Sequence, residues 1–228
     1  MKMEMYNLFP TMVLDAENSK HQELKTSVMP KLIKYIGEDG YSGETKSPMN
    51  LQQDSDLSEL YSFITHAARM YLTGLCLDPD DFNFNITKSW MNAIQNFSIG
   101  YHCHPDAHLS CSYYMNVPKD YAHKIVFHNY GDRHEPYPGC IRMNNPSEWN
   151  SFNSYTWGFE PKEGHLFLFP SNLSHSVDSP GTEDTPMKTL KDLKSRRISI
   201  ATDIILTYKN KQARSIGFQP VSEWRTFK

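Results

Sequence analysis

Hydrophobic residues near the start of the chain follow first an extended and then a helical spacing. The segment from Tyr6 to Leu14 surrounds Pro10 with apolar side chains, which suits an edge strand or extended arm better than a helix. Between residues 24 and 33 the apolar positions recur at helical intervals, although Pro30 should break or restart the helix. We therefore predict an arm followed by one interrupted helix.

A second helix has the most regular pattern in the sequence. Asp56 and Glu59 resemble a capping box at its start, and Asp78 with Pro79 should end it. Such a helix should pack one face against the rest of the molecule. The apolar stripe that forms this face comprises Leu57, Leu60, Tyr61, Ile64, Ala68, Tyr71, Leu72 and Leu75.

From Phe82 onward the pattern changes to short β-type runs separated by Pro, Gly and Asn, which is typical of an antiparallel sandwich or barrel. Two long polar stretches, 131–150 and 179–195, should be loops between strands. The predicted strands are Ile86–Ile94, Gly100–His104, Leu109–Val117, Lys124–His128, Tyr155–Phe159, His165–Pro170, Ser174–Asp178 and Arg197–Tyr208.

The length of 228 residues fits a single domain. We expect residues 1–80 to supply a strand and helices that support the core, residues 81–210 to form the β core, and residues 211–228 to form a tail. Because no run of apolar residues approaches the length of a membrane span and the N-terminus lacks a signal pattern, we predict a soluble, cytoplasmic protein without a membrane partner.

Charge gives no indication of a nucleic-acid partner. The net charge is −3, and the lysines and arginines are scattered rather than gathered into a basic patch. The four cysteines form no Cys-x-x-Cys pair, so neither a zinc knuckle nor a thioredoxin-type redox motif is predicted. The candidate chemistry therefore lies with the histidines.

Two histidines stand two residues apart just before a predicted strand. Side chains at this spacing share one face of a strand, so His102 and His104 can point together into a barrel while Cys103 points away. His175 re-enters a strand far along the chain, after Pro170 and a polar turn. A non-haem Fe(II) site needs three protein ligands on one face of an octahedron, and this set could supply them.

The usual acidic member of such a triad is less clear in this sequence. The pair His104 and Asp106 also fits the common histidine-x-aspartate pattern. However, Pro105 should end the strand and turn Asp106 outward, so we favour His102 with His104 and keep Asp106 as the alternative ligand. A triad of three histidines would be unusual.

A second group of residues could anchor an anionic cosubstrate. The planar guanidinium of Arg197 can hold a carboxylate through two hydrogen bonds, which a lysine cannot do. Ser199 lies on the same strand face and can add a hydroxyl donor, whereas Arg196 should point the other way. Together these residues suit the distal carboxylate of 2-oxoglutarate.

Six short motifs follow one another along most of the chain: Leu8-Phe9-Pro10-Thr11, Trp90-Met91-Asn92, His102-Cys103-His104-Pro105, Ser110-Cys111-Ser112-Tyr113-Tyr114, Phe169-Pro170-Ser171-Asn172-Leu173-Ser174-His175 and Arg197-Ile198-Ser199. In this order they resemble a 2-oxoglutarate and iron(II)-dependent oxygenase family of bacteria and phages. The strand Ser110-Cys111-Ser112-Tyr113-Tyr114-Met115-Asn116 also resembles, more distantly, the corresponding strand of the prolyl hydroxylases.

The resemblance implies a mainly β protein with N-terminal helices and a double-stranded β-helix core, a jelly-roll barrel of the cupin-like type. It implies Fe(II), 2-oxoglutarate and O2 as cofactors, and conversion of the last two to succinate and CO2 with hydroxylation of a substrate. Asn92 and one of the two tyrosines, Tyr113 or Tyr114, would be further cosubstrate contacts, and we select Tyr113. A phage-encoded member would act in the host cytoplasm.

Two other functions stay open at this point. A cupin-like metal-binding or isomerase protein could use the same barrel and histidines without 2-oxoglutarate, although Arg197 and Ser199 argue against it. A non-catalytic barrel that binds no metal is the second. The primary substrate and the oligomeric state do not follow from the sequence, because specificity in such a barrel resides in its loops.

Overall fold

The computed structural model describes most of the chain. The described residues are Glu4, 10–37, 47–119, 121, 123–128, 148–150, 154–179, 184–210 and 217–227. Residues 6–9 of the predicted arm, most of the predicted loop 131–150 and part of the predicted tail therefore lie outside the described residues.

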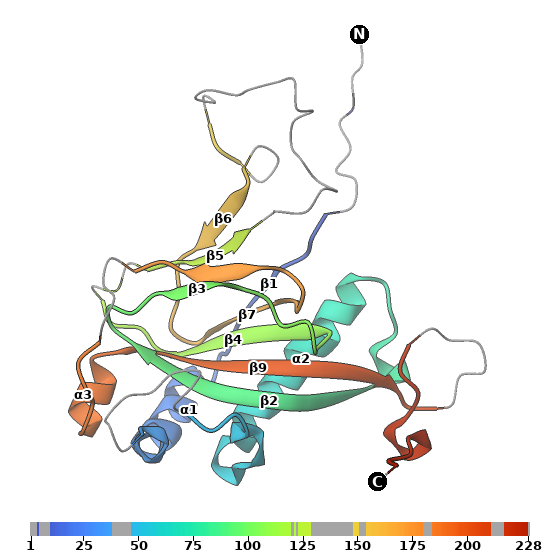
Figure 1. Cartoon of the computed structure of the whole chain (residues 1–228), viewed down its shortest axis with the longest axis horizontal. Coiled ribbons are helices and arrows are strands. Elements are labelled where there is room, and N and C mark those ends of the chain that lie inside the picture. The colour runs from blue at the N-terminus through green and yellow to red at the C-terminus, as the bar shows by residue number, and fades with distance from the viewer. Residues whose placement is uncertain are drawn as a thin grey trace.

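Two antiparallel sheets form the core of the structure (Figure 1). The larger sheet has the strand order β1-β7-β4-β9-β2, and the smaller sheet has the order β3-β8-β5-β6. Their strands are β1 (Leu14–Glu17), β2 (Phe82–Ile94), β3 (Ile99–His102), β4 (Leu109–Asn116), β5 (Ile125–His128), β6 (Thr156–Phe159), β7 (His165–Pro170), β8 (His175–Val177) and β9 (Arg197–Tyr208).

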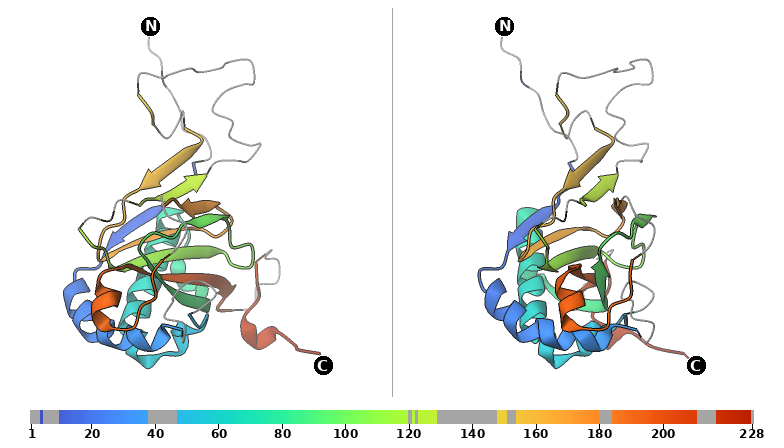
Figure 2. Two further views of the ribbon diagram at one scale, coloured as in Figure 1. Left: turned by 60° about the vertical axis from the view of Figure 1, so that its left-hand side comes forward. Right: turned by 90° about the vertical axis from the view of Figure 1, so that its left-hand side faces the viewer.

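Helices cover the face of the larger sheet that is turned away from the smaller one (Figures 1 and 2). The first is α1 (His21–Val28), which continues into a 3₁₀ helix (Met29–Tyr35), and the second is α2 (Ser58–Gly74). Pro30 lies in the first turn of the 3₁₀ helix, where its missing N–H costs no hydrogen bond, so the predicted interruption is confirmed. None of the helices in the described part of the chain has the length and apolar character of a membrane span.

Alternation along the central strands divides the apolar residues between two layers. On β9, Ile198, Ile200 and Ile204 join the cluster beneath the helices. Arg197 and Ser199, which alternate with these isoleucines, face the space between the two sheets, where a smaller cluster gathers. This second cluster consists of Tyr114, Ile125, Phe127, Phe167 and Phe169.

The predicted strands agree closely with the observed ones, and the bounds of β7 and β9 are the predicted bounds. Two details were wrong. Asp56 does not cap α2, because the helix begins at Ser58 and the Asp56 carboxylate instead pairs with Lys31. The predicted loop 179–195 contains a further short helix, α3 (Leu190–Lys194), with a capping box formed by its preceding residue Thr189 and by Asp192.

One glycine is required by its backbone conformation and by the helix packed against it. Gly164, in the turn before β7, has a φ of +82°, and a Cβ at this position would lie 2.9 Å from the His21 ring. Gly164→Ala should therefore lower the free energy of unfolding by about 1–3 kcal/mol, measured by chemical denaturation. Gly100→Ala is the matched control because a Cβ there meets no atom within 4 Å. Equal unfolding midpoints for the two variants would contradict this account.

Candidate metal centre

Strand pairing in the smaller sheet brings two of the predicted histidines together. His102 ends β3, His175 begins β8, and the two residues are direct partners in the antiparallel register. His104 follows two residues later, where its backbone N–H donates to the carbonyl of Ser171 at 2.8 Å. The turn after β7 therefore contacts the segment that carries His104, and the same turn leads into β8, which begins with His175.

The three imidazoles form one cluster between the sheets. Ring centres are 4.3 Å apart for His102 and His175, and 5.2 Å apart for His104 with each of the other two. One ligand atom from each ring can be chosen such that all three atoms lie within 4.8 Å of one another. Three nitrogen donors at this separation suit one metal ion with its remaining coordination positions open.

Hydrogen bonds to the Nδ1 atoms leave the Nε2 atoms available to a metal ion. His102 Nδ1 lies 2.7 Å from the carbonyl oxygen of Gly100, and His175 Nδ1 lies 3.0 Å from that of Leu173. Since a carbonyl oxygen only accepts, each Nδ1 carries the proton and each Nε2 keeps its lone pair. The Nε2 of His104 is buried and has no hydrogen-bond partner in the described structure, as expected of an atom meant for a metal.

Burial also keeps one of the ligands uncharged. It lowers the pKa of His175 to about 4, and the neighbouring His102 and His104 act in the same direction. At neutral pH the imidazole of His175 is therefore neutral, and its lone pair is available to a metal without loss of a proton.

Asp106 is not part of this cluster. Its side chain is more than half exposed and forms an ion pair with Lys88 of β2. The segment after His104 turns outward, as predicted from Pro105, so the alternative of a His104 and Asp106 pair does not fit the geometry.

Beside the histidines lies a pocket between the sheets that contains the predicted anchor residues. Arg197 is only 1% exposed, and its Nε and Nη2 atoms have no hydrogen-bond partner among the described residues. Its guanidinium carbon lies 5.7 Å from the ring centre of Tyr114 and 5.5 Å from that of Tyr121. A buried guanidinium with free donors is costly unless an anion binds there, and a carboxylate would satisfy both of its free atoms.

The remaining predicted contacts divide between the two faces of the larger sheet. Asn92 and Ser199 are cross-strand partners, and both line the pocket. Tyr113 does not, because it faces the helices, where its hydroxyl lies 2.7 Å from Nδ1 of His21. The selection of Tyr113 was therefore wrong, and the pocket is lined instead by Tyr114, whose buried hydroxyl has no hydrogen-bond partner in the described residues.

Three further residues at or beside the pocket were given no role from the sequence, although Trp90 and Ser110 belong to the motifs that carry the resemblance. Asp203 and Ser110 are cross-strand partners on β9 and β4, and the carboxylate Oδ1 of Asp203 lies 2.6 Å from Nδ1 of His104. Trp90 lies 5.5 Å from the His104 ring, centre to centre, and its buried Nε1 has no partner in the described part of the chain. Extending the period-two pattern along β9 from Arg197 would have placed Asp203 on the pocket face.

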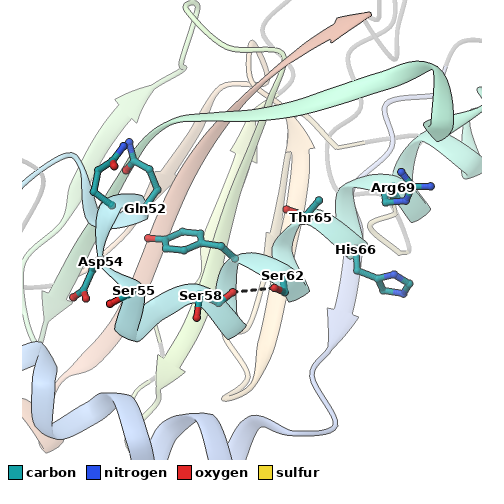
Figure 3. A pocket seen from close by; sticks show the side chains of 10 residues that line it. Gln52, Asp54, Ser55, Ser58, Ser62, Thr65, His66 and Arg69 are labelled. Atoms are coloured by element: carbon teal, nitrogen blue, oxygen red, sulfur yellow. Dashed lines mark hydrogen bonds between the residues drawn. The ribbon is translucent and has the colours of Figure 1, made fainter. Parts of the chain in front are cut away.

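A second hollow lies elsewhere and has a different character. It is an open polar groove along the outer side of α2, where the side chains of Gln52, Ser58, Ser62 and His66 are spread along the surface (Figure 3). Ser62 donates to the backbone carbonyl of Ser58 at 3.0 Å, within the helix itself. The groove gathers no ligand set like that of the histidines, so the pocket between the sheets is the candidate site.

Comparison with known proteins points to the same segment. Residues 88–188 match the family model described as "Putative 2OG-Fe(II) oxygenase". The segment that carries the site is similar to the 2-oxoglutarate and iron(II)-dependent oxygenases. This match covers less than half of the 228 residues; it includes all three histidines but ends before β9. The resemblance found in the motifs is thus confirmed, and the family it names uses Fe(II), 2-oxoglutarate and O2.

Solved structures of such oxygenases share the fold. A prolyl-4-hydroxylase from Pseudomonas putida is 10% identical with a TM-score of 0.52, and the alignment covers 86% of this chain and 92% of that one. EctD from S. alaskensis, solved with 2-oxoglutarate and 5-hydroxyectoine, is 14% identical with a TM-score of 0.52, covering 86% and 72%. The predicted fold, mainly β with a double-stranded β-helix core, is thereby confirmed.

Other comparisons add less. An oxidoreductase of the 2OG-Fe(II) oxygenase family from Burkholderia pseudomallei is 14% identical with a TM-score of 0.41; the alignment covers 75% of this chain and only 65% of that protein. A search of curated proteins finds no match.

Proposed function

We propose that this chain is a 2-oxoglutarate-dependent Fe(II) dioxygenase that hydroxylates a substrate still to be identified, with conversion of 2-oxoglutarate and O2 to succinate and CO2. One observation carries the proposal. The same pocket holds three imidazoles whose Nδ1 atoms are engaged elsewhere and a buried guanidinium, Arg197, whose Nε and Nη2 atoms have no hydrogen-bond partner among the described residues. A site of this composition suits a metal together with a dicarboxylate.

Each residue has a distinct part in this proposal. His102, His104 and His175 would hold Fe(II), which when bound supplies the activation of dioxygen. Arg197 binds the distal carboxylate of 2-oxoglutarate, and Ser199 with Asn92 line the same pocket and add hydrogen bonds. Apolar side chains close the pocket and keep water from the metal, namely Ile99, Ile125, Phe169 and Val177.

A binding measurement and a turnover measurement together test the proposal. Under anaerobic conditions, Fe(II) and 2-oxoglutarate added together should give a visible charge-transfer band that neither gives alone. With O2 and ascorbate, the protein should release succinate from 2-oxoglutarate. A cupin-like metal protein would bind Fe(II) without responding to 2-oxoglutarate, and a non-catalytic barrel would bind neither; either result would refute the proposed function.

Neighbouring tyrosines offer a matched pair of variants. Tyr114→Phe removes a hydroxyl that lines the pocket near Arg197, so the KM for 2-oxoglutarate should rise about 3–10-fold, the value of one neutral hydrogen bond, while metal content stays unchanged. Tyr113→Phe removes the hydrogen bond to His21 on the other face and should lower stability without changing KM. Steady-state kinetics and thermal unfolding check both, and the opposite pattern would return the role to Tyr113.

Two further features belong to the proposal. We infer a single oxygenase domain over residues 1–228 and a cytoplasmic location. The candidate classes of primary substrate are peptides, nucleobases and small molecules, and a screen for substrate-dependent succinate release distinguishes them.

A further inference from the structure

One carboxylate stands directly behind the metal-binding cluster. Asp203 is 2% exposed, on the pocket-facing side of β9. Its Oδ1 accepts a hydrogen bond from the hydroxyl of Ser110 at 2.6 Å and lies 2.6 Å from Nδ1 of His104. Ser110 is the direct cross-strand partner of Asp203, so the strand register of β4 and β9 fixes this contact. The family match ends before β9 and therefore does not include Asp203.

We propose that Asp203 is a positioning residue that supplies, from outside the coordination sphere, the negative charge and the orientation that a carboxylate ligand supplies in the usual facial triad. The inference rests on the proposed function, since it assumes that His102, His104 and His175 hold Fe(II). It adds a role for a residue that contacts no metal and no cosubstrate itself.

Charge is the first part of the argument. Two imidazoles and one carboxylate reduce the charge of a divalent ion by one, whereas three neutral imidazoles leave it unchanged. A carboxylate that accepts a hydrogen bond from the Nδ1–H of a ligand histidine makes the opposite nitrogen more basic and places a negative charge one ring away from the metal. Asp203 does this for His104.

Orientation is the second part. Among the described residues, the Nδ1 atoms of His102 and His175 contact only neutral backbone carbonyls. Of the three histidines, His104 alone has a charged partner in this part of the chain, and the Trp90 ring lies beside it with ring centres 5.5 Å apart. Because Asp203 is itself held by Ser110, the tautomer and the ring plane of His104 are fixed before a metal arrives.

The test compares two identical substitutions of an aspartate. Asp203→Asn keeps the side-chain volume and an oxygen acceptor, so it removes mainly the charge. Asp106→Asn is the control, because it makes the same change in net charge two residues from His104, on an exposed side chain outside the cluster. The probe is Co(II), titrated into metal-free protein and followed by its visible spectrum.

We expect Asp203→Asn to weaken Co(II) binding about 10–100-fold and to alter the Co(II) spectrum, the size of effect typical of a partner of a ligand histidine. Asp106→Asn should bind Co(II) as the unaltered protein does. Thermal unfolding of the metal-free protein separates a role at the metal from a loss of structure. If Asp203→Asn lowered the unfolding temperature and kept the Co(II) affinity, Asp203 would have only a structural role, and the inference would be overturned.

A second variant decides the matter if Asp203→Asn does not fold. Ser110→Ala leaves the charge in place and removes the hydroxyl that holds the carboxylate, so Co(II) binding should weaken severalfold, less than for the loss of the charge. Unchanged affinity would overturn the inference. Failure of the proposed function looks different. If the histidines hold no metal, the unaltered protein binds Co(II) no better than His175→Ala does; if only the 2-oxoglutarate part fails, the unaltered protein binds Co(II) but does not respond to 2-oxoglutarate.

Discussion

Replacing His175 by alanine should abolish both iron binding and succinate release. The cluster offers three imidazoles, and His175 holds its place through the β3–β8 register and through the Nδ1 contact with the Leu173 carbonyl. Loss of one of three ligands leaves a bidentate site, so metal affinity should fall by more than the roughly 10–100-fold caused by losing a partner of a ligand. Metal content after dialysis and succinate release measure the two effects.

A nearby histidine provides the control for this experiment. The backbone N–H of Leu206 donates to Nδ1 of His108, whose ring packs on Phe218 outside the metal cluster. His108→Ala should therefore retain metal and turnover. If His175→Ala kept the iron content of the unaltered protein, the metal would have to bind elsewhere, and the triad would be wrong.

The strands were largely predictable because they depend on local alternation, whereas β3 ends at His102 and a contact with the turn after β7 holds His104 in the cluster. Apolar runs bounded by Pro, Gly and polar turns gave β7 and β9 their bounds. The two-residue spacing of His102 and His104 placed them on a common side, and the rings do lie together. Alternation alone does not show which of the two faces of a strand lines the pocket.

Tyr113 and Tyr114 illustrate that limit. Adjacent residues on a strand necessarily face opposite layers, and both tyrosines are fully buried, so composition does not distinguish them. Packing determines which tyrosine faces the pocket. The Tyr113 hydroxyl contacts His21 on the side of the helices, and the Tyr114 ring lies beside Arg197 between the sheets. Helix docking, which joins residues far apart in the chain, decides the assignment.

Asp203 was missed for a related reason. It lies 99 residues from His104 along the chain, in a strand whose other members are mostly apolar, and no short motif links the two. The pairing of β4 with β9 places Ser110 opposite Asp203, and the segment just before β4 brings the imidazole of His104 to the same carboxylate. The short helix α3 was missed because five helical residues are too few to show a periodicity.

The second large effect should come from Arg197→Lys, which keeps the charge and removes the planar pair of donors. Arg197 is buried, with its Nε and Nη2 atoms unpartnered among the described residues, so the distal carboxylate of 2-oxoglutarate can take both. We expect the Kd for 2-oxoglutarate to rise about 100-fold, or about 2.7 kcal/mol, in an anaerobic titration of the Fe(II) protein. Iron content should stay unchanged, because Arg197 is outside the histidine cluster.

Arg196→Lys is the matched control for this variant. Arg196 is equally buried but points to the other side, where its Nη2 donates to the backbone carbonyl and the hydroxyl of Thr185. The same substitution one residue away should therefore disturb the segment before α3 and leave the Kd for 2-oxoglutarate unchanged. If both variants bound 2-oxoglutarate as the unaltered protein does, another group would hold the distal carboxylate, and the buried guanidinium of Arg197 would need a different anion.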